Sequence, residues 1–307
     1  MLRNRRKPFT ALTQVNLFLF TLIFSILGCR SSQMATLPAT TESLAFPSWF
    51  WNPPTGLAFP TAVGYALSSS IHPESSVEAA TRDGLEQLAK HIRVRIHGER
   101  ISINQIRAED FQEEVLPSDQ QRVTDKHKIL ASHATPTLTI VFLGLGELGD
   151  FSNQQTVSLK AMPRPDWMQT PSHQKGYLYG VGHCNPRHRP ERGWHDAEYN
   201  ARLDVALNLQ ASVRQIMKRF DAQIETVAST QTDVVLHGIE VVSRWFDSKE
   251  QTYHVLVRTP ISKNRETMHE EARNLMSQSK EITQPSPDEL IRRAFEELEQ
   301  ESEPMNQ

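Results

Sequence analysis

The sequence predicts an α+β protein that contains two tandem modules, each with one helix packed on a small, mostly antiparallel sheet, followed by C-terminal helices. The first observation behind this prediction is an internal repeat, since Pro47 and Trp49 recur as Pro165 and Trp167 at a constant offset (165 − 47 = 118). The second observation is that both copies present a proline-rich opening, a short strand and a helix in the same order. Two modules of one fold explain both observations.

Further identities support the repeat. A shared tryptophan is not expected by chance in a chain with five tryptophans. The other identities at the same offset are Pro53/Pro171, Val63/Val181, Gly64/Gly182, Ala79/Ala197 and Leu85/Leu203. The repeat divides the chain into a signal peptide, a flexible tether, a first module, a second module and a charged helical tail, at 1–28, 29–46, 47–163, 164–262 and 263–307.

Each module opens with the pattern Pro-x-Trp-x-x-x-Pro, at 47–53 and 165–171. Proline fixes φ and disfavours helix for the residue before it, so we expect these segments to be extended. The two tryptophans cover the helix–sheet core in this interpretation, because they hold equivalent places in both modules. The alternative is that Trp49, Trp51 and Trp167 stack on sugar rings of peptidoglycan.

A short strand follows each opening, at 62–67 and 177–183. Gly64 and Gly182 lie within these strands, where glycine marks the close approach of another backbone or a ring. We therefore assign both glycines to the structural core.

A helix follows each strand, and Pro73 and Pro190 mark the helix starts. Apolar and small residues recur at helical spacing on one face of each helix. Small residues at the middle of both stripes let the helix lie close to a sheet. The stripes are Val77, Ala80, Gly84, Leu88 and Ile92, then Trp194, Ala197, Ala201, Val205 and Leu209.

Beyond each helix, apolar and polar residues alternate along the chain, which predicts strands. We expect strands to continue out of the helices at 92–106 and 213–224, and hairpin partners at 137–143 with 156–161 and at 234–246 with 252–259. The first module is longer, which predicts a polar and mobile insertion within 107–134. The tail predicts two helices, 265–281 and 288–301, the second with a capping box formed by Ser286 and Glu289.

The N-terminal segment has the order of an export signal. Arg3, Arg5, Arg6 and Lys7 precede an apolar run from Leu17 to Leu27, and Ile26-Leu27-Gly28-Cys29 follows at once. A membrane span needs ~20 apolar residues, and this run has about half that number. The four residues resemble the bacterial lipobox, which implies cleavage before Cys29 and lipidation of that cysteine. The alternative is an ordinary cleavage site with Cys29 as a stray thiol.

Composition and charge narrow the function classes. The net charge of −3 and the pI near 6.5 lack the basic footprint of nucleic-acid binding. Cys184 is the only cysteine besides Cys29, so an internal disulfide is not expected once Cys29 carries lipid. Arg30 follows Cys29 in place of the aspartate that often marks retention at the inner membrane, which favours the outer membrane.

The chain resembles the LPP20 family of bacterial lipoproteins, whose related modules also occur in a flagellar assembly protein. The resemblance rests on the Pro-x-Trp openings, the Val-Gly steps that end in Gly64 and Gly182, the small residues of the helices, and the Trp245 and Tyr253 strand pair. It covers about 47–260 as two copies and fits the second better, since the first lacks counterparts of Trp245 and Tyr253. It implies a surface or periplasmic lipoprotein without a known reaction.

Two motifs suggest chemistry, but we expect neither to supply it. Gly144 to Gly149 match the dinucleotide fingerprint, yet no helix opens at the last glycine, so we expect a hairpin turn. His183, Cys184, His188 and His195 form a cluster without the spacing of known metal sites, and His183 and Cys184 point to opposite faces of a strand. We predict no metal, no cofactor and no catalytic residue.

Two function classes remain. The first is a non-catalytic scaffold in the cell envelope, anchored in the outer membrane by lipid, facing the periplasm or the cell surface, that binds an envelope protein or a second copy of itself. The second is a periplasmic hydrolase or a carbohydrate- or peptidoglycan-binding lipoprotein that uses tryptophan and histidine residues. A deep cleft with convergent polar groups would favour the second class.

Overall fold

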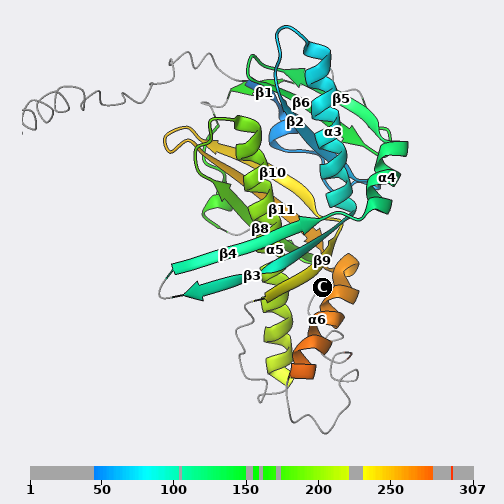
Figure 1. The fold of residues 1–307 in the computed structure, drawn as a ribbon, viewed down its shortest axis with the longest axis vertical. Helices are drawn as coiled ribbons and strands as arrows, with labels where there is room; N and C mark the ends of the chain where they lie inside the picture. The colour runs from blue at the N-terminus through cyan, green and yellow to red at the C-terminus, as the bar shows by residue number, and fades with distance from the viewer. Residues whose placement is uncertain are drawn as a thin grey trace, which may run out of the picture. The chain divides into compact units, whose positions relative to one another are not determined.

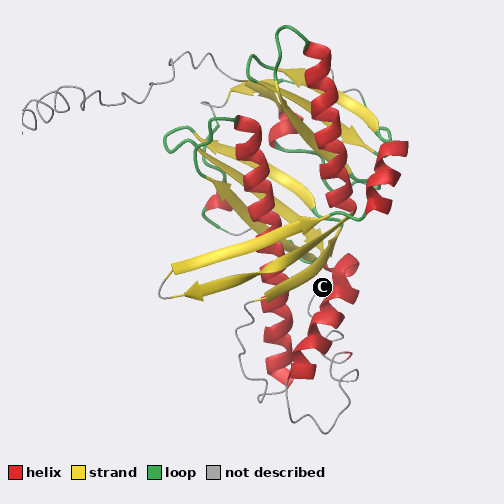
Figure 2. Ribbon diagram, in the orientation of Figure 1, coloured by secondary structure: helices red, strands yellow, loops and turns green. Residues whose placement is uncertain are grey.

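A computed structural model describes residues 45–103, 106–149, 155–158, 162–170, 174–220, 231–278 and Arg292. These residues all belong to one compact unit, Ser43–Gln307. Figure 2 shows helices together with several small antiparallel sheets, which confirms the predicted α+β class. The signal peptide, Cys29 and nearly all of the tether lie outside the described residues.

The first helix–sheet unit contains β2 (Thr61–Leu67), α3 (Pro73–Ile92), β5 (Lys128–Ala134) and β6 (Leu138–Gly144). Its three strands are antiparallel in the order β2-β6-β5. The helix begins at Pro73, as the sequence predicts, because proline suits a first helical position that needs no N–H bond.

The second helix–sheet unit contains β8 (Tyr177–Cys184), α5 (Pro190–Phe220), β10 (Glu240–Asp247) and β11 (Thr252–Pro260). Its sheet has the order β10-β11-β8 and is also antiparallel. In both units the strand before the helix pairs with the last strand (Figure 1).

Both sheets also carry one irregularity in the same pair of strands. The register shifts between Ile129 and Ala131 in β5, and between Val241 and Ser243 in β10. A bulge of this kind bends the strand and increases its twist. The two units therefore share strand order and the position of their bulge.

A third sheet joins strands from both halves of the chain. It consists of β3 (Arg93–Ile103), β4 (Ile106–Glu114) and β9 (Gln231–His237) in the order β4-β3-β9. The strand expected at 92–106 is thus present as β3. The segment 107–134, expected to be a polar and mobile insertion, instead contains most of β4, all of α4 (Pro117–Lys126) and β5.

The hairpin predicted at 137–143 with 156–161 is wrong, whereas the one predicted at 234–246 with 252–259 is confirmed in its second half, where β10 pairs with β11. β6 pairs with β2 and β5, whereas β7 (Thr156–Ser158) pairs with β1 (Ala45–Pro47). The segment 234–246 is not one strand, because Gly238, with φ of 69°, separates β9 from β10 and the two lie in different sheets.

The strand predicted at 213–224 is also wrong. α5 continues as far as Phe220, and residues 221–230 lie outside the described part of the chain. Val213 and Met217 extend the stripe of Leu209 at intervals of four residues, and all three side chains are buried. The helical period therefore persists where an alternating pattern was expected.

The proline-rich openings are short helical turns and not extended segments. α2 (Ser48–Trp51) follows Pro47, and η2 (Asp166–Met168), a 3-10 helix, follows Pro165. Each proline precedes the first helical residue with an extended backbone, φ of −64° and −75°. A proline at this boundary does not break the turn, because its missing N–H is not needed there.

The tail begins with η3 (Ile261–Asn264) and α6 (Arg265–Gln278), which matches the first predicted tail helix. The second, 288–301, with its capping box, lies outside the described residues. None of the helices in the described residues is both long and apolar enough to cross a membrane.

Candidate functional site

Gly64 and Gly182 lie where a strand meets its helix at backbone distance. A Cβ built on Gly64 would lie 2.0 Å from the Ala80 carbonyl oxygen, and one built on Gly182 would lie 2.0 Å from the Ala197 carbonyl oxygen. No side chain fits at either place. Both glycines therefore fix the distance between sheet and helix.

The helix contacts reveal a change of register between the units. Gly64 lies 16 positions before Ala80 (80 − 64 = 16), whereas Gly182 lies 15 positions before Ala197 (197 − 182 = 15). The chain between the glycine and its helix contact is one residue shorter in the second unit. Ala80, and not Ala79 as the constant offset indicated, thus holds the place of Ala197.

The two equivalent tryptophans have different surroundings. Trp49 is 2% exposed, and its ring stacks on Phe142 with a centroid distance of 5.4 Å. Trp167 is half-buried, and the 3-10 turn η2 that carries it has no fully buried residue. Part of its side chain is covered, including the indole Nε1, and its core role stays a prediction.

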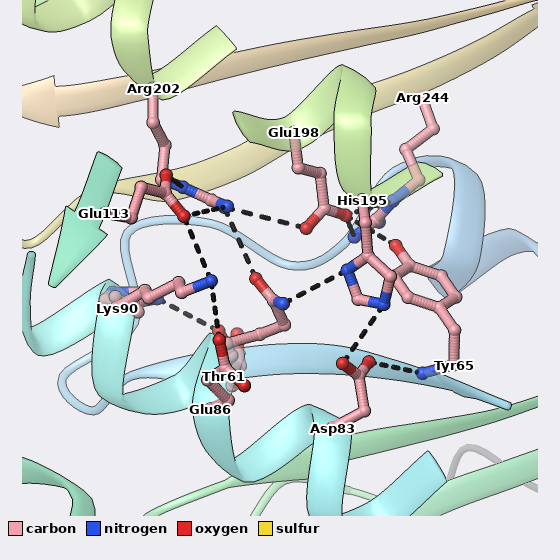
Figure 3. A network of polar contacts seen from close by, with 12 residues as sticks. Thr61, Tyr65, Asp83, Glu86, Lys90, Glu113, His195, Glu198, Arg202 and Arg244 are labelled. Atoms are coloured by element: carbon pink, nitrogen blue, oxygen red, sulfur yellow. Dashed lines mark hydrogen bonds and ion pairs between the residues drawn. The ribbon is translucent and has the colours of Figure 1, made fainter. Parts of the chain in front are cut away.

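A polar network fills the seam between the two helix–sheet units (Figure 3). Its centre is Glu198 of α5, whose Oε1 accepts hydrogen bonds from the Tyr65 hydroxyl at 2.5 Å and from Arg244 Nη2 at 2.7 Å. Arg244 Nη1 also donates to the Phe50 carbonyl oxygen at 2.8 Å. Glu198 and Arg244 are 1% exposed each, so this ion pair lies in the interior.

A second arm of the network connects α5 to the third sheet. Arg202 Nε donates to Glu113 Oε1 at 2.5 Å, and Arg202 Nη2 donates to Glu113 Oε2 at 3.1 Å. Lys90 Nζ lies 3.0 Å from Glu113 Oε2 and 2.8 Å from Glu86 Oε1. The arm therefore links three structural elements through charge-assisted bonds.

A third arm connects the two helices directly. His195 Nε2 lies 3.1 Å from Asp83 Oδ1, and His195 Nδ1 lies 3.3 Å from Gln87 Nε2. Asp83 Oδ2 also accepts a hydrogen bond from the Tyr65 backbone N–H at 2.7 Å. Asp83 thus ties the edge of β2 to both helices.

The network keeps Glu198 and Glu113 ionised. Burial raises the pKa of Glu198, but the charges of Arg244 and Arg202 and the bond from Tyr65 outweigh burial, so the pKa lies below its ordinary value. The same balance, with Arg202 and Lys90 as the cations, lowers the pKa of Glu113. Burial is the main reason why the pKa of Tyr65 is raised, so the phenol remains protonated.

The space beside the network is small. Its cavity measures about 30 Å³ and is lined by Glu198, Arg202 and Arg244 among others. A cavity needs roughly 10–15 Å³ to hold one water, so this one accommodates water and no organic substrate. Each ionised group named above already has a partner inside the protein. The arrangement holds the two units together and leaves no group free for catalysis at this place.

The histidine and cysteine cluster does not assemble into a ligand set. Cys184 is buried and its Sγ lies 3.6 Å from Asp196 Oδ2, while His183 is exposed and His188 lies in the loop before α5. In the described ranges no group of three or more histidine, cysteine or acidic residues is placed to hold a metal ion. Gly144 ends β6, and residues 145–149 form a turn and loop without a helix.

Sequence reasoning missed the seam network. One signal was available, since Glu198 and Arg202 follow Trp194 at intervals of four and therefore lie beside the apolar stripe of α5. Charged residues next to such a stripe are buried when a second body covers that face. Nothing in the sequence indicated that another part of the protein covers this face of α5.

Comparison with known proteins gives one match. Residues 165–260 match the family model described as LPP20 lipoprotein, a range that runs from the turn before η2 to the last residue of β11. No curated protein and no solved structure matches the chain. The family match covers the second helix–sheet unit, so this part of the chain is similar to the LPP20 lipoproteins.

Proposed function

We propose that this protein is a non-catalytic scaffold of the cell envelope that is anchored by lipid on Cys29 and binds a protein partner. The match of residues 165–260 to a lipoprotein family supports an envelope protein. The charged start, the short apolar run and Ile26-Leu27-Gly28-Cys29 support lipid attachment at that cysteine. Arg30 after the cysteine favours the outer membrane.

The observation that carries the non-catalytic proposal is the seam network. Its ionisable side chains bond to one another beside a cavity of about 30 Å³. A catalytic site needs space for a substrate next to its acid, base or nucleophile. The network instead holds the two helix–sheet units together, as expected for a scaffold.

We further propose that the two helix–sheet units are tandem LPP20-like modules, at 47–163 and 164–262. The shared strand order, the shared bulge and the equivalent approach of Gly64 and Gly182 to their helices support this proposal. Edge strands offer the binding surface for a partner or a second copy, because an edge presents unpaired backbone groups. β8 is such an edge in the order β10-β11-β8.

Replacement of Cys29 tests the anchor. We expect Cys29→Ser to abolish incorporation of an alkyne-labelled fatty acid and to leave an uncleaved precursor. Cys184→Ser is the matched control, since it removes the only other cysteine, whose thiol is buried. Labelling of Cys29→Ser at the level of the native protein, or its normal fractionation with mature outer-membrane proteins, would show that the lipid anchor is wrong.

Crosslinking in living cells tests the scaffold role. The full chain, captured after crosslinking, should yield a defined envelope protein or a dimer. Sedimentation with purified peptidoglycan tests the carbohydrate-binding alternative on the same material. Saturable binding to peptidoglycan that Trp167→Ala removes, with no protein crosslinks, would favour that alternative.

A further inference from the structure

A pocket of about 330 Å³ lies where the C-terminal end of α3, the end of β9 and η3 meet. Its apolar walls include Leu57, Phe59 and Leu145, and its cations are Arg122 of α4 and Lys263 of η3. Small-molecule sites occupy roughly 300–1,000 Å³. This cationic pocket is therefore large enough for a small organic molecule, unlike the cavity beside the seam network.

No carboxylate lines the cationic pocket in the part of the chain that the structure describes. The other ionisable side chains on its wall are His91 and His237. Burial is the main reason why the pKa of each imidazole is lowered, so both rings are neutral at pH 7. The charge of the pocket thus comes from Arg122 and Lys263 and is positive.

Two of the carboxylates that act on the pocket histidines, Asp119 and Glu240, are already paired with arginines. Asp119 Oδ2 accepts a hydrogen bond from Arg93 Nε at 2.9 Å, and Glu240 Oε1 accepts one from Arg258 Nε at 2.7 Å. Because each of these carboxylates is paired with an arginine, it attracts Arg122 and Lys263 only weakly. The exposed acid Glu266, in the first turn of α6, does not line the pocket.

Lys263 lies across Gly238 at the pocket wall. A Cβ built on Gly238 would lie 2.7 Å from Lys263 Cδ and 3.1 Å from Lys263 Nζ. The Gly238 N–H donates to the Ile92 carbonyl oxygen at 3.2 Å. That bond occupies a carbonyl at the C-terminal end of α3, whose partial negative charge would otherwise disfavour an anion.

We propose that the cationic pocket binds an oxyanion carried on an apolar body, with a phosphate or carboxylate group held by Arg122 and Lys263 and the apolar body against Leu57, Phe59 and Leu145. Arginine offers two parallel N–H donors to such a group, and lysine adds a point charge. Contact with the apolar walls removes the apolar body from water, which stabilises the complex. This binding site does not depend on the scaffold role.

Calorimetric titration of the full chain in lipid nanodiscs tests the site, with empty discs as the blank. Phenyl phosphate is the probe because it joins an oxyanion to one ring. Benzyl alcohol has the ring without the charge, and inorganic phosphate has the charge without the ring. We expect each comparator to bind at least about tenfold more weakly than phenyl phosphate, because each lacks one of the two contacts.

Charge reversal identifies the site. Arg122→Glu and Lys263→Glu should each weaken phenyl phosphate binding at least about tenfold, since a repelling charge replaces an attracting one. Both side chains are exposed, so the variants should keep the native circular dichroism. Lys249→Glu makes the same change of charge at an exposed position in the β10–β11 turn and should alter Kd by less than about twofold.

Three results would overturn this proposal. The first is equal binding of benzyl alcohol and phenyl phosphate, which would show that the cations do not contribute. The second is equal binding of inorganic phosphate, which would show that the apolar walls do not contribute. The third is unchanged binding by both charge-reversal variants, which would place the probe elsewhere.

Discussion

The Tyr65 hydroxyl donates a 2.5 Å hydrogen bond to Glu198, a residue 133 positions away in the other helix–sheet unit. A hydrogen bond to a charged group contributes about 1.5–3 kcal/mol, against roughly 0.5–1.5 kcal/mol for a neutral bond. We expect Tyr65→Phe to lower the free energy of unfolding within the first range. Tyr199→Phe, which removes a bond to the Phe111 carbonyl oxygen, should cost less. Urea unfolding of both variants measures the difference, and a larger loss for Tyr199→Phe would contradict it.

The Glu198–Arg244 pair should behave as one unit. Glu198→Gln leaves the buried Arg244 without its counter-charge, and loss of one member of a buried pair costs ~3–5 kcal/mol. Arg244→Met should cost a similar amount. The double variant Glu198→Gln/Arg244→Met should be more stable than the sum of the single losses predicts, because neither member of the pair is left as a buried charge without its partner. Additive losses in a double-mutant cycle would show that the two residues do not interact.

Gly64→Ala and Gly182→Ala should both destabilise the protein. The new methyl group would meet the Ala80 or Ala197 carbonyl oxygen at 2.0 Å, so the helix must move away from its sheet. Overpacking of this kind typically costs about 1–3 kcal/mol, and more where backbone must shift. Gly149→Ala is the matched control, since nothing lies within 4 Å of its added Cβ. Thermal melts compare the three, and equal melting temperatures would contradict the close approach.

Trp49→Ala should be far more damaging than Trp167→Ala. Removal of a buried aromatic side chain costs ~3–5 kcal/mol, and Trp49 is 2% exposed and stacked on Phe142. Trp167 is half-buried, so its replacement should cost less. Calorimetric melting of both variants provides the measurement. A greater loss for Trp167→Ala would contradict this order and would support a core role for Trp167.

The contact of Asp83 with His195 should make stability depend on pH. Burial lowers the pKa of His195, but the bond and charge of Asp83 outweigh burial, so the pKa lies above its ordinary value of 6.5. A raised pKa in the folded state gives stability that is complete below about pH 6.5 and is lost as pH rises through the folded-state pKa. The advantage of the native protein over His195→Gln should therefore shrink as pH rises.

Urea unfolding at pH 6 and pH 8.5 measures that advantage. Asp83→Asn keeps an acceptor for the Tyr65 N–H but removes the charge that raises the pKa of His195, so the advantage of native His195 should shrink less as pH rises in this background. An advantage that grows with pH would mean that the neutral imidazole is the form that stabilises the fold.

Local patterns predicted much of the fold. Pro73 and Pro190 correctly marked the starts of two helices, because a proline at a helix start acts through its own backbone. Gly64 and Gly182 indicated close approach for a similarly local reason. The error at 213–224 arose because Val213 suits both a strand and a helix, and only its packing with the rest of the α5 stripe decides between them.

The seam network could not be predicted in the same way. Glu198 and Arg202 on one helix were visible, but Arg244 lies on a strand and Tyr65 in the other unit. The side chains that meet between two packed units depend on how the units are placed. That placement produces no periodic pattern in the sequence. Trp167 shows the same limit, since an equivalent position in a repeat does not imply equivalent burial.

The pairing of β3 with β9 determines when folding can finish. Arg93 of β3 lies opposite His237 of β9, 144 positions later (237 − 93 = 144). Contacts between residues so far apart form slowly, because a long loop must close first. During synthesis, β3 therefore lacks a neighbour on this side until more than two thirds of the polypeptide exists. A chain that stops after the first unit would keep an open strand edge exposed to other proteins, which is a route to aggregation.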